Sequence, residues 1–474
     1  MSSHRADTSL ILWSWLLLVL LLSGQSRLRF VNVSVAPAAT PCTDAADAST
    51  ATYIRQGAGG AGSGADWTNA LTTLPTTLTR GRTYCVADTT TGFGAWSVTS
   101  HASGSTYTKI VKATIADHGT ATGWLDTMGD GQAIFSAASG GGVGTFNYNV
   151  SGSGFLEING QLTTCGAKQW AAGGSQTCGL QFNQTTTGGA YVMRFVSGGQ
   201  NSIIRYTEAR GPSGDSTADF NYPSDAVGIG GGPADLTISN SYIHNNSTNT
   251  DAASTNEILE YSLVSNSRSN NGNSHSNVMF IGGDINGLDI RYNVVTNYND
   301  EGLFLTWFSS QTGPRNVRIY GNIMYSPSTT NPRGVELRQA DGAGQVNYAD
   351  IVINNNTFAD LSVAGIFDRS GETFGGTCTS CSATNNISVN AGNSFTNMTS
   401  SNNTNDSTTS RFVAYGTNFH LTAALAGTAL GTIYNMDLLG NTRGADGTWD
   451  RGAYEFCSGG CTFARLSPRY FPWL

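Results

Sequence analysis

The stretch Gly302-Leu-Phe-Leu-Thr-Trp307, followed after a turn by Val317-Arg-Ile-Tyr-Gly-Asn322-Ile-Met324, occurs three times in related form. Its later copies, and one more copy of the second half, are Gly334–Gln339 with Ile351–Phe358, Gly365–Ser370 with Cys381–Ser388, and Leu288–Val295. An asparagine recurs in the second halves at intervals of 29, 34 and 30 residues, at Asn293, Asn322, Asn356 and Asn386. Repeats of this length predict a solenoid, and the alternation of apolar and polar residues predicts strands.

Each repeat has room for three short strands, two of them separated by a tight bend at the asparagine. An asparagine tolerates the left-handed backbone conformation, and its side-chain amide can bond to the asparagine of the next coil. The sequence therefore predicts an all-β fold, a three-sheet right-handed parallel β-helix, rather than a β-sandwich, whose turns do not recur at equal intervals. This pattern resembles the pectate-lyase-like superfamily of bacterial secreted β-helix proteins.

The composition fits an extracellular solenoid with polar turns. The 474 residues include 59 glycines, only 12% of residues are charged, and the net charge is −8. A solenoid lengthens without a new core, so we expect one long domain with caps at its ends. The negative charge and the lack of a basic stripe argue against nucleic acid as a partner.

The N-terminal region predicts export from the cytoplasm. Residues 1–26 contain the apolar run Leu10–Leu22, which is too short for a membrane span and suits a signal peptide, although an uncleaved anchor stays open. We expect no stable membrane span after cleavage, and a secreted or cell-surface location. Residues 27–50 form a linker, and residues 51–130 form an N-terminal cap with the first strands. A short helix starting at Asp66 is predicted from apolar residues at helical spacing: Trp67, Leu71, Leu74 and Leu78.

We expect the coils to occupy residues 131–392, a mobile polar loop residues 393–410, and a closing module residues 411–474. The last segment resembles the "choice-of-anchor Q" module of bacterial β-helix proteins through Gly440-Asn-Thr-Arg443 and Gly452-Ala-Tyr-Glu455. It departs from that module after Phe419-His-Leu421, where Thr-Ala-Ala-Leu-Ala replaces the usual Ser-Pro-Ala. The resemblance implies an architecture and no chemistry.

Eight cysteines in a chain with a predicted signal peptide indicate disulfides. Proximity in the sequence predicts Cys165–Cys178, Cys378–Cys381 and Cys457–Cys461, which leaves Cys42–Cys85 for the N-terminal segment. A zinc site formed by Cys378, Cys381, Cys457 and Cys461 is the weaker alternative, because no histidine lies near them in the sequence.

The outward face of the first strand of each coil is where polysaccharide-active β-helices place their sites. Aligning the strands places Glu336, Arg338 and Arg369 outward, with Arg338 and Arg369 in adjacent coils. Two stacked guanidinium groups need an anion, which Glu336 or the carboxylate of a substrate can supply. The same alignment places Met279 outward. It also points Asp368 into the core, so either the coil slips there or Asp368 is buried and bonded.

Further candidates lie in the turns that lead into these strands. His275, Asp300, Glu301 and Arg333 add charged or titratable groups. The aromatic residues Tyr298, Phe304, Trp307 and Phe308 offer ring faces on which sugars could stack. Asp300 and Glu301 could equally hold Ca²⁺, which prefers clustered oxygens. Packing between loops is the alternative role of the aromatic residues.

These candidates indicate an extracellular polysaccharide as partner, with three functions open. Elimination from a uronate-containing glycan would use Arg338 or Arg369 as the base, because the chain's lysines are Lys109, Lys112 and Lys168, all before the later coils. An inverting glycoside hydrolase would use two carboxylates from Glu301, Asp300 and Glu336. A non-catalytic glycan-binding or structural surface protein would need neither. We predict elimination ahead of the other two.

Overall fold

Strands dominate the structure, as the alternating segments predict. The computed structural model describes residues 41–44, 50–89, 91–137, 143–147, 154–185, 191–196, 201–212, 227–230, 235–246, 248–252, 255–267, 277–282, 285–307, 311–327, 331–339, 348–369 and 377–456. The predicted signal peptide lies outside these residues. Within them, no helix has the length and apolar character needed to span a bilayer.

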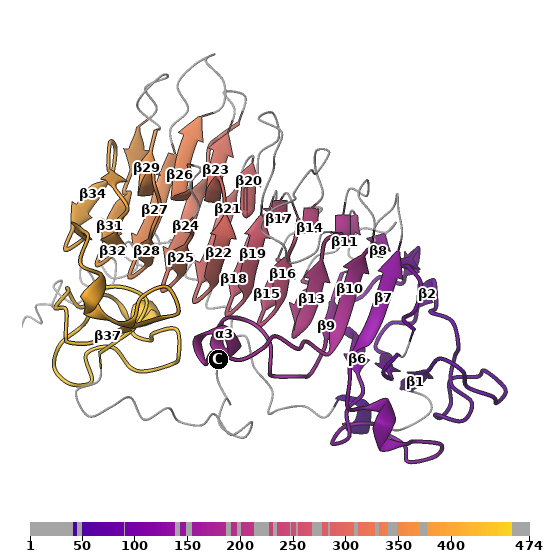
Figure 1. Cartoon of the computed structure of the whole chain (residues 1–474). Helices are drawn as coiled ribbons and strands as arrows, with labels where there is room; N and C mark the ends of the chain where they lie inside the picture. The colour runs from indigo at the N-terminus through magenta and orange to yellow at the C-terminus, as the bar shows by residue number, and fades with distance from the viewer. Residues whose placement is uncertain are drawn as a thin grey trace, which may run out of the picture. The chain divides into compact units, whose positions relative to one another are not determined.

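Three long parallel sheets run through the described part of the chain (Figure 1). Sheet 1 comprises β1 (Ala51–Ile54), β3 (Thr83–Val86), β6 (Thr108–Lys112), β9 (Leu156–Asn159), β12 (Ile203–Arg205), β15 (Thr237–Ser239), β18 (Glu257–Glu260), β21 (Asn286–Arg291), β24 (Arg315–Tyr320), β27 (Tyr348–Asn354), β30 (Cys378–Thr379), β31 (Ser382–Thr384) and β34 (Thr399–Ser401). Sheet 2 comprises β7 (Ala133–Ala137), β10 (Leu180–Gln184), β13 (Thr207–Arg210), β16 (Tyr242–His244), β19 (Leu263–Ser267), β22 (Val294–Tyr298), β25 (Ile323–Tyr325), β28 (Thr357–Ala359), β32 (Ile387–Val389) and β35 (Thr404–Asp406). Sheet 3 comprises β4 (Trp96–Val98), β8 (Gly144–Asn147), β11 (Tyr191–Val196), β14 (Val227–Gly230), β17 (Thr248–Ala252), β20 (Met279–Gly282), β23 (Glu301–Trp307), β26 (Arg333–Gln339), β29 (Ala364–Asp368) and β33 (Asn393–Ser394).

The chain visits the three sheets in turn. Strands β20, β21 and β22 lie in sheets 3, 1 and 2, and β23 returns to sheet 3 beside β20. Every pair of neighbouring strands in these sheets is parallel, so each coil stacks on the one before it at the usual strand spacing of about 4.8 Å. The fold is therefore the predicted right-handed parallel β-helix.

A ladder of asparagine side chains joins the coils at the bend between sheets 1 and 2. The amide Nδ2 of Asn293 donates to Oδ1 of Asn322 at 3.0 Å, and the same bond links Asn322 to Asn356 and Asn356 to Asn386. Asn386 donates in turn to Asn403 at 2.9 Å. These side chains are buried or nearly so, and their bonds confirm the role that the repeat predicts.

The residue before each ladder asparagine, rather than the asparagine itself, takes the left-handed conformation. Positive φ angles occur at Tyr292 (57°), Gly321 (66°), Asn355 (52°) and Asn385 (59°). At each bend, therefore, the residue with positive φ turns the chain, and the asparagine that follows it joins the coils.

Apolar side chains from all three sheets fill the interior. On sheet 3 the buried residues Met279, Leu303 and Val335 are in register, which shows that the prediction of Met279 as outward was wrong by one residue. Its neighbour Phe280 instead lies in register with Phe304 on the outward face. On β23 and β26 the predicted inward positions are found, because Leu305 and Leu337 are fully buried.

The N-terminal segment differs from its prediction. No helix forms from Asp66 onward; Leu71 instead exchanges two backbone hydrogen bonds with the chain around β1, donating to Tyr53 O and accepting from Arg55 N. Trp67 is fully buried, with its ring 4.8 Å from that of Tyr53. The apolar residues thus pack against β1, which is already part of sheet 1. Helix α2 (Pro41–Asp44) and the two-stranded pair β2 (Thr77–Leu78) and β5 (Ser100–His101) complete this region.

The polar segment predicted as a mobile loop forms one more coil instead. Strands β33, β34 and β35 lie between residues 393 and 406, each paired with the preceding coil. Asn403 gives the reason, because it occupies the ladder position and accepts the bond from Asn386. Phe395 and Met398, the two apolar residues of this segment, pack against the interior cluster, and backbone and amide bonds join the coil to its neighbour.

The C-terminal segment packs along the outer side of sheet 2. The antiparallel pair β36 (Phe412–Ala414) and β37 (Asn418–Leu421) buries Phe412, Phe419 and Leu421 in one apolar cluster with Val294 and Ile323 of sheet 2. Helix α3 (Ala167–Ala171) and short 3₁₀ turns at Asp126–Met128, Thr409–Arg411 and Thr432–Tyr434 are the other helical elements of the described residues.

The Gly-Asn-x-Arg motif of this segment acts through its arginine. Arg443 is buried and donates to the carbonyl oxygens of Asp450, Gly452 and Ala453. These bonds join the two motifs that carry the resemblance to a closing module. That resemblance itself stays a prediction.

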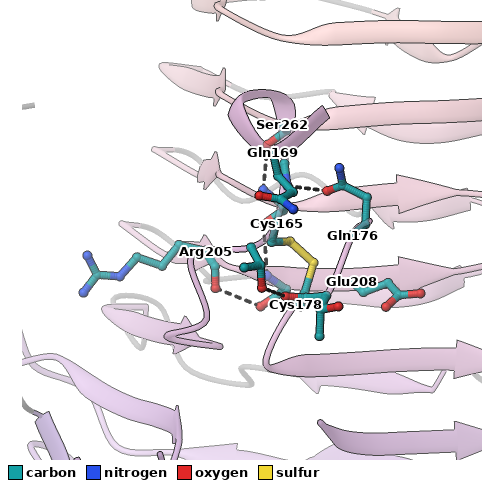
Figure 2. The surroundings of a disulfide bond; sticks show 12 residues. Cys165, Gln169, Gln176, Cys178, Arg205, Glu208 and Ser262 are labelled. Atoms are coloured by element: carbon teal, nitrogen blue, oxygen red, sulfur yellow. Dashed lines mark hydrogen bonds between the residues drawn. A yellow bond between two sulfur atoms is a disulfide. The ribbon is translucent and has the colours of Figure 1, made fainter. Parts of the chain in front are cut away.

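Three of the four predicted disulfides are present: Cys42–Cys85, Cys165–Cys178 and Cys378–Cys381. Figure 2 shows the second of these closing the segment between β9 and β10, where Gln176 accepts a hydrogen bond from Gly166 N. That segment carries α3, whose first residue donates from its backbone to Tyr261 O at 2.8 Å. Cys457 and Cys461 lie outside the described residues.

Candidate functional site

Three neighbouring strands of sheet 3 carry most of the predicted site: β23, β26 and β29. Their register sets Glu301 beside Arg333, Phe304 beside Glu336, and Thr306 beside Arg338. Because side chains alternate along a strand, Glu336 and Arg338 share the outward face. The coil-to-coil pairing therefore brings together residues from segments about thirty positions apart in the sequence.

An acid–arginine cluster forms on these strands; it consists of Asp300, Glu301, Arg333, Glu336 and Arg369. Nη1 of Arg333 lies 2.8 Å from both Asp300 Oδ1 and Glu301 Oε1. Its Nε lies 3.3 Å from Glu336 Oε2, and Nη1 of Arg369 lies 3.4 Å from Glu336 Oε1. Two arginines thus share three carboxyl groups, with Glu336 bridging them.

Burial decides the charge state of this cluster. Glu336 is fully buried, and Glu301 retains 5% of its exposed area. Burial raises the pKa of Glu301 to about 9, with the negative charges of Asp300 and Glu336 adding to the rise and Arg333 opposing it. Glu301 therefore holds a proton at neutral pH, and two carboxylates face two guanidinium groups.

Arg338 stands apart from this balanced set. It is partly exposed on the outward face of β26, and no carboxylate of the described residues lies within ion-pair distance of it. The backbone of Arg369 continues the register beside it, since Arg369 N donates to Leu337 O at 3.0 Å. The backbones of Arg338 and Arg369 are thus adjacent on neighbouring coils, while the Arg369 side chain is directed to Glu336.

Two of the four predicted aromatic residues do not lie at the site. Tyr298 and Trp307 are fully buried in the interior cluster, where the Trp307 ring packs 4.8 Å from that of Tyr348. Trp307 has the same alternation as Leu303 and Leu305, which explains its inward position. Neither ring can offer a face to a sugar, so that prediction is wrong for both. Phe304 lies on the outward face but is only 4% exposed.

Phe367 is an aromatic residue of this face that the sequence analysis did not select as a binding residue. The guanidinium carbons of Arg333 and Arg369 lie 5.7 and 5.4 Å from the centre of its ring. The ring is in register with Glu336, so it supports both arginines that Glu336 pairs with. Its alternation with the buried Ile366 was the signal that could have identified it.

Asp368 confirms one of the two alternatives left open by the sequence. It is fully buried, Tyr348 donates its hydroxyl to Oδ1 at 3.4 Å, and Asn397 N donates to Oδ2 at 2.8 Å. The coil does not slip, since Leu337 and Asp368 stay in register. Asp368 thus secures the end of β29, directly before Arg369.

The predicted calcium site does not fit the residues present. The oxygens of Asp300 and Glu301 that would share the ion both face the guanidinium group of Arg333. Among the described residues, no group of three or more histidine, cysteine, aspartate or glutamate side chains could hold a metal ion. His275 and Phe308 lie outside the described residues, so their roles stay predictions.

Comparisons with known proteins show a likeness of structure alone. No protein-family model matches the chain, and no curated protein matches its sequence. Among solved structures, the chain is similar to the crystal structure of pectate lyase Pel9A, with 14% sequence identity and a TM-score of 0.44. The match covers 88% of this chain and all of the other.

Proposed function

We propose that the outward face of sheet 3 around Arg338 binds a uronate-containing polysaccharide outside the cell and cleaves it by elimination. The observation that carries this proposal is the position of Arg338, a partly exposed guanidinium group beside a cluster whose own charges are already matched. An arginine in that position receives a carboxylate with two parallel hydrogen bonds. A glycan with carboxylates along its length supplies that group from solvent.

Arg369 and Arg338 have different roles in the proposed elimination. Arg369, with its side chain 29% exposed, adds positive charge beside the carboxylate of the sugar and so makes the adjacent C–H more acidic. Once the glycan has bound, Arg338 loses a proton to solvent and, as the neutral guanidine, takes the proton from carbon, while Arg369 keeps its charge beside the carboxylate. Arg338 is the group on this face left for that role, because the three lysines of the chain lie elsewhere, on β6 and α3. Glu336, buried between Arg333 and Arg369, is a positioning residue.

Hydrolysis is the second candidate, and the protonated Glu301 favours it. A carboxyl group whose pKa is raised to about 9 can serve as a general acid at neutral pH. An inverting hydrolase also needs a water molecule between two carboxyl groups. Here Arg333 lies between Glu301 and Glu336, and both acids are nearly fully buried, which supports the first candidate over the second.

A panel of uronate-containing polysaccharides tests the proposal. Elimination gives unsaturated sugars that absorb in the ultraviolet, whereas hydrolysis gives reducing ends without that absorbance. We expect Arg338→Ala to abolish both the absorbance and the binding of the glycan while leaving the melting temperature unchanged. Arg318→Ala, a change of the same size on sheet 1, is the matched control. Binding without any product would indicate a glycan-binding protein rather than an enzyme. Full activity in Arg338→Ala would overturn the proposed site.

A further inference from the structure

A buried ion pair lies on sheet 1, outside the proposed site. Lys112 ends β6 in register with Val86 of β3, and Asp88 follows two residues later. The Nζ atom of Lys112 contacts Oδ1 of Asp88, and the two side chains are 0% and 12% exposed. Lys112 is among the largest fully buried side chains of the described residues. No step of the proposed function uses it.

The surroundings of this pair offer an ammonium ion fewer acceptors than it has donors. An ammonium group carries three N–H donors. Within the described residues Lys112 Nζ has one hydrogen-bond acceptor, the carbonyl oxygen of Ala113, in addition to its contact with Asp88. Asp88 Oδ1 is buried, and its partner among the described residues is Nζ of Lys112 itself. One N–H group with one acceptor, which is what an amide nitrogen needs, would fit these surroundings.

We propose that Lys112 and Asp88 condense to an isopeptide bond that joins the second and third strands of sheet 1. A bond forms between Nζ of Lys112 and Cγ of Asp88, and the bond between Cγ and Oδ1 breaks. The ammonium and the carboxylate together lose one oxygen and two protons, which leave as water. The remaining N–H points to Ala113 O. No oxidant or second reactant takes part.

Three features of the surroundings favour this condensation. The backbone N–H of Gly131 donates to Asp88 Oδ2, where it can stabilise negative charge as the amine attacks. Burial lowers the pKa of Lys112, which increases the fraction of nucleophilic amine. The product replaces two desolvated charges by a neutral amide, and two groups held in contact react far more readily than free ones.

Tryptic digestion of the whole protein tests this inference. After denaturation, reduction and alkylation, trypsin should cleave after Arg82, Lys109 and Lys168 but not at a modified Lys112. We expect residues 83–109 linked to residues 110–168, lighter than the sum of the two peptides by one water molecule. Fragmentation should place the link at Asp88 and Lys112. Free Ile110-Val-Lys112 together with free residues 113–168 and no linked species would overturn the inference.

Two variants locate the bond, and the wild-type digest decides the question if either fails to fold. Asp88→Ala removes the carboxyl group and should release the peptide Ile110–Lys112. Asp88→Asn can form the same amide with loss of ammonia, so it should restore the linked peptide at the wild-type mass. A link that persists in Asp88→Ala would contradict the assignment to this pair.

Discussion

Charge is arranged in two ways on the outer faces of sheets 1 and 3. On sheet 1 three acids pair with an arginine across the coil boundary: Glu157 with Arg205, Glu260 with Arg291, and Asp289 with Arg318. On sheet 3 three acids share Arg333 and Arg369, while Arg338 has no acid within ion-pair distance among the described residues. The three pairs of sheet 1 match one acid to one arginine, whereas Arg338 lies outside the shared cluster of sheet 3.

The two faces also differ in solvent exposure. The arginine side chains of sheet 1 are 26% to 40% exposed, so water screens their ion pairs. Glu336 on sheet 3 is fully buried between its two partners. Acid–arginine pairs therefore stabilise sheet 1 weakly, whereas on sheet 3 they determine the electrostatics of the face. Variants of matched size on the two sheets can measure this difference.

The largest expected difference comes from Glu336→Gln. The amide has the same size as the carboxyl group, but it leaves Arg333 and Arg369 without a buried counter-charge. Removing one partner of a buried ion pair costs about 3 kcal/mol or more. We expect the free energy of unfolding, measured with urea, to fall by about that amount. Glu260→Gln on sheet 1 is the control and should cost about 1 kcal/mol; equal losses would erase the distinction between the faces.

Glu301 should make stability depend on pH. Its pKa in the folded protein is about 9, above the ordinary value of 4.5, so the folded state binds a proton that the unfolded state has lost between these values. The contribution of Glu301 to stability is therefore fully present below pH 4.5 and falls as pH rises towards 9, by about 1 kcal/mol per pH unit. Glu455, whose pKa is raised to about 7, and Lys168, whose pKa is lowered by burial to about 8, also titrate near this range, so a comparison with a variant is needed to isolate Glu301.

The matching variant is Glu301→Gln, which stays neutral at every pH. Its free energy of unfolding should change less between pH 7 and 9 than that of the wild type, and it should be the more stable protein at pH 9. Urea denaturation at the two pH values measures both quantities. Curves that run parallel would show that Glu301 is ionised in the folded state.

The smallest effect is expected for Arg318→Ala. Its side chain is 40% exposed, and its hydrogen bond to Asp289 Oδ2 is 2.6 Å long. An exposed ion pair contributes about 0.5 kcal/mol. Thermal unfolding should detect little change, and binding of uronate glycans should be unaffected. A loss of binding would indicate that the glycan binds to sheet 1 rather than to sheet 3.

Much of the fold could be predicted because its repeat is carried by a polar residue. The intervals between Asn293, Asn322, Asn356 and Asn386 identify the coil, and their amide bonds join each coil to the next. The last coil was not predicted, because its segment lacks the apolar alternation by which strands were recognised. Asn403 was the remaining signal, 17 residues after Asn386, but its interval is shorter than the others.

The site could be predicted only as far as alternation along strands extends. Alternation placed Glu336 outward and Asp368 inward, and both positions are found. It could not predict that Glu336 is fully covered, since cover depends on how Arg333 and Arg369 fold over Phe367. Tyr298 and Trp307 were assigned by residue type rather than by position on the strand, and both proved to be interior residues.

The asparagine ladder makes the coil a unit of insertion and deletion. Removing residues 322–355 would bring Asn356 into the place that Asn322 occupies, so the amide chain could close again over the gap. The same excision would take away Arg333, Glu336 and Arg338 together. Architecture and chemistry can therefore be exchanged separately in this protein, because one is specified by every coil and the other by a single coil with its neighbours.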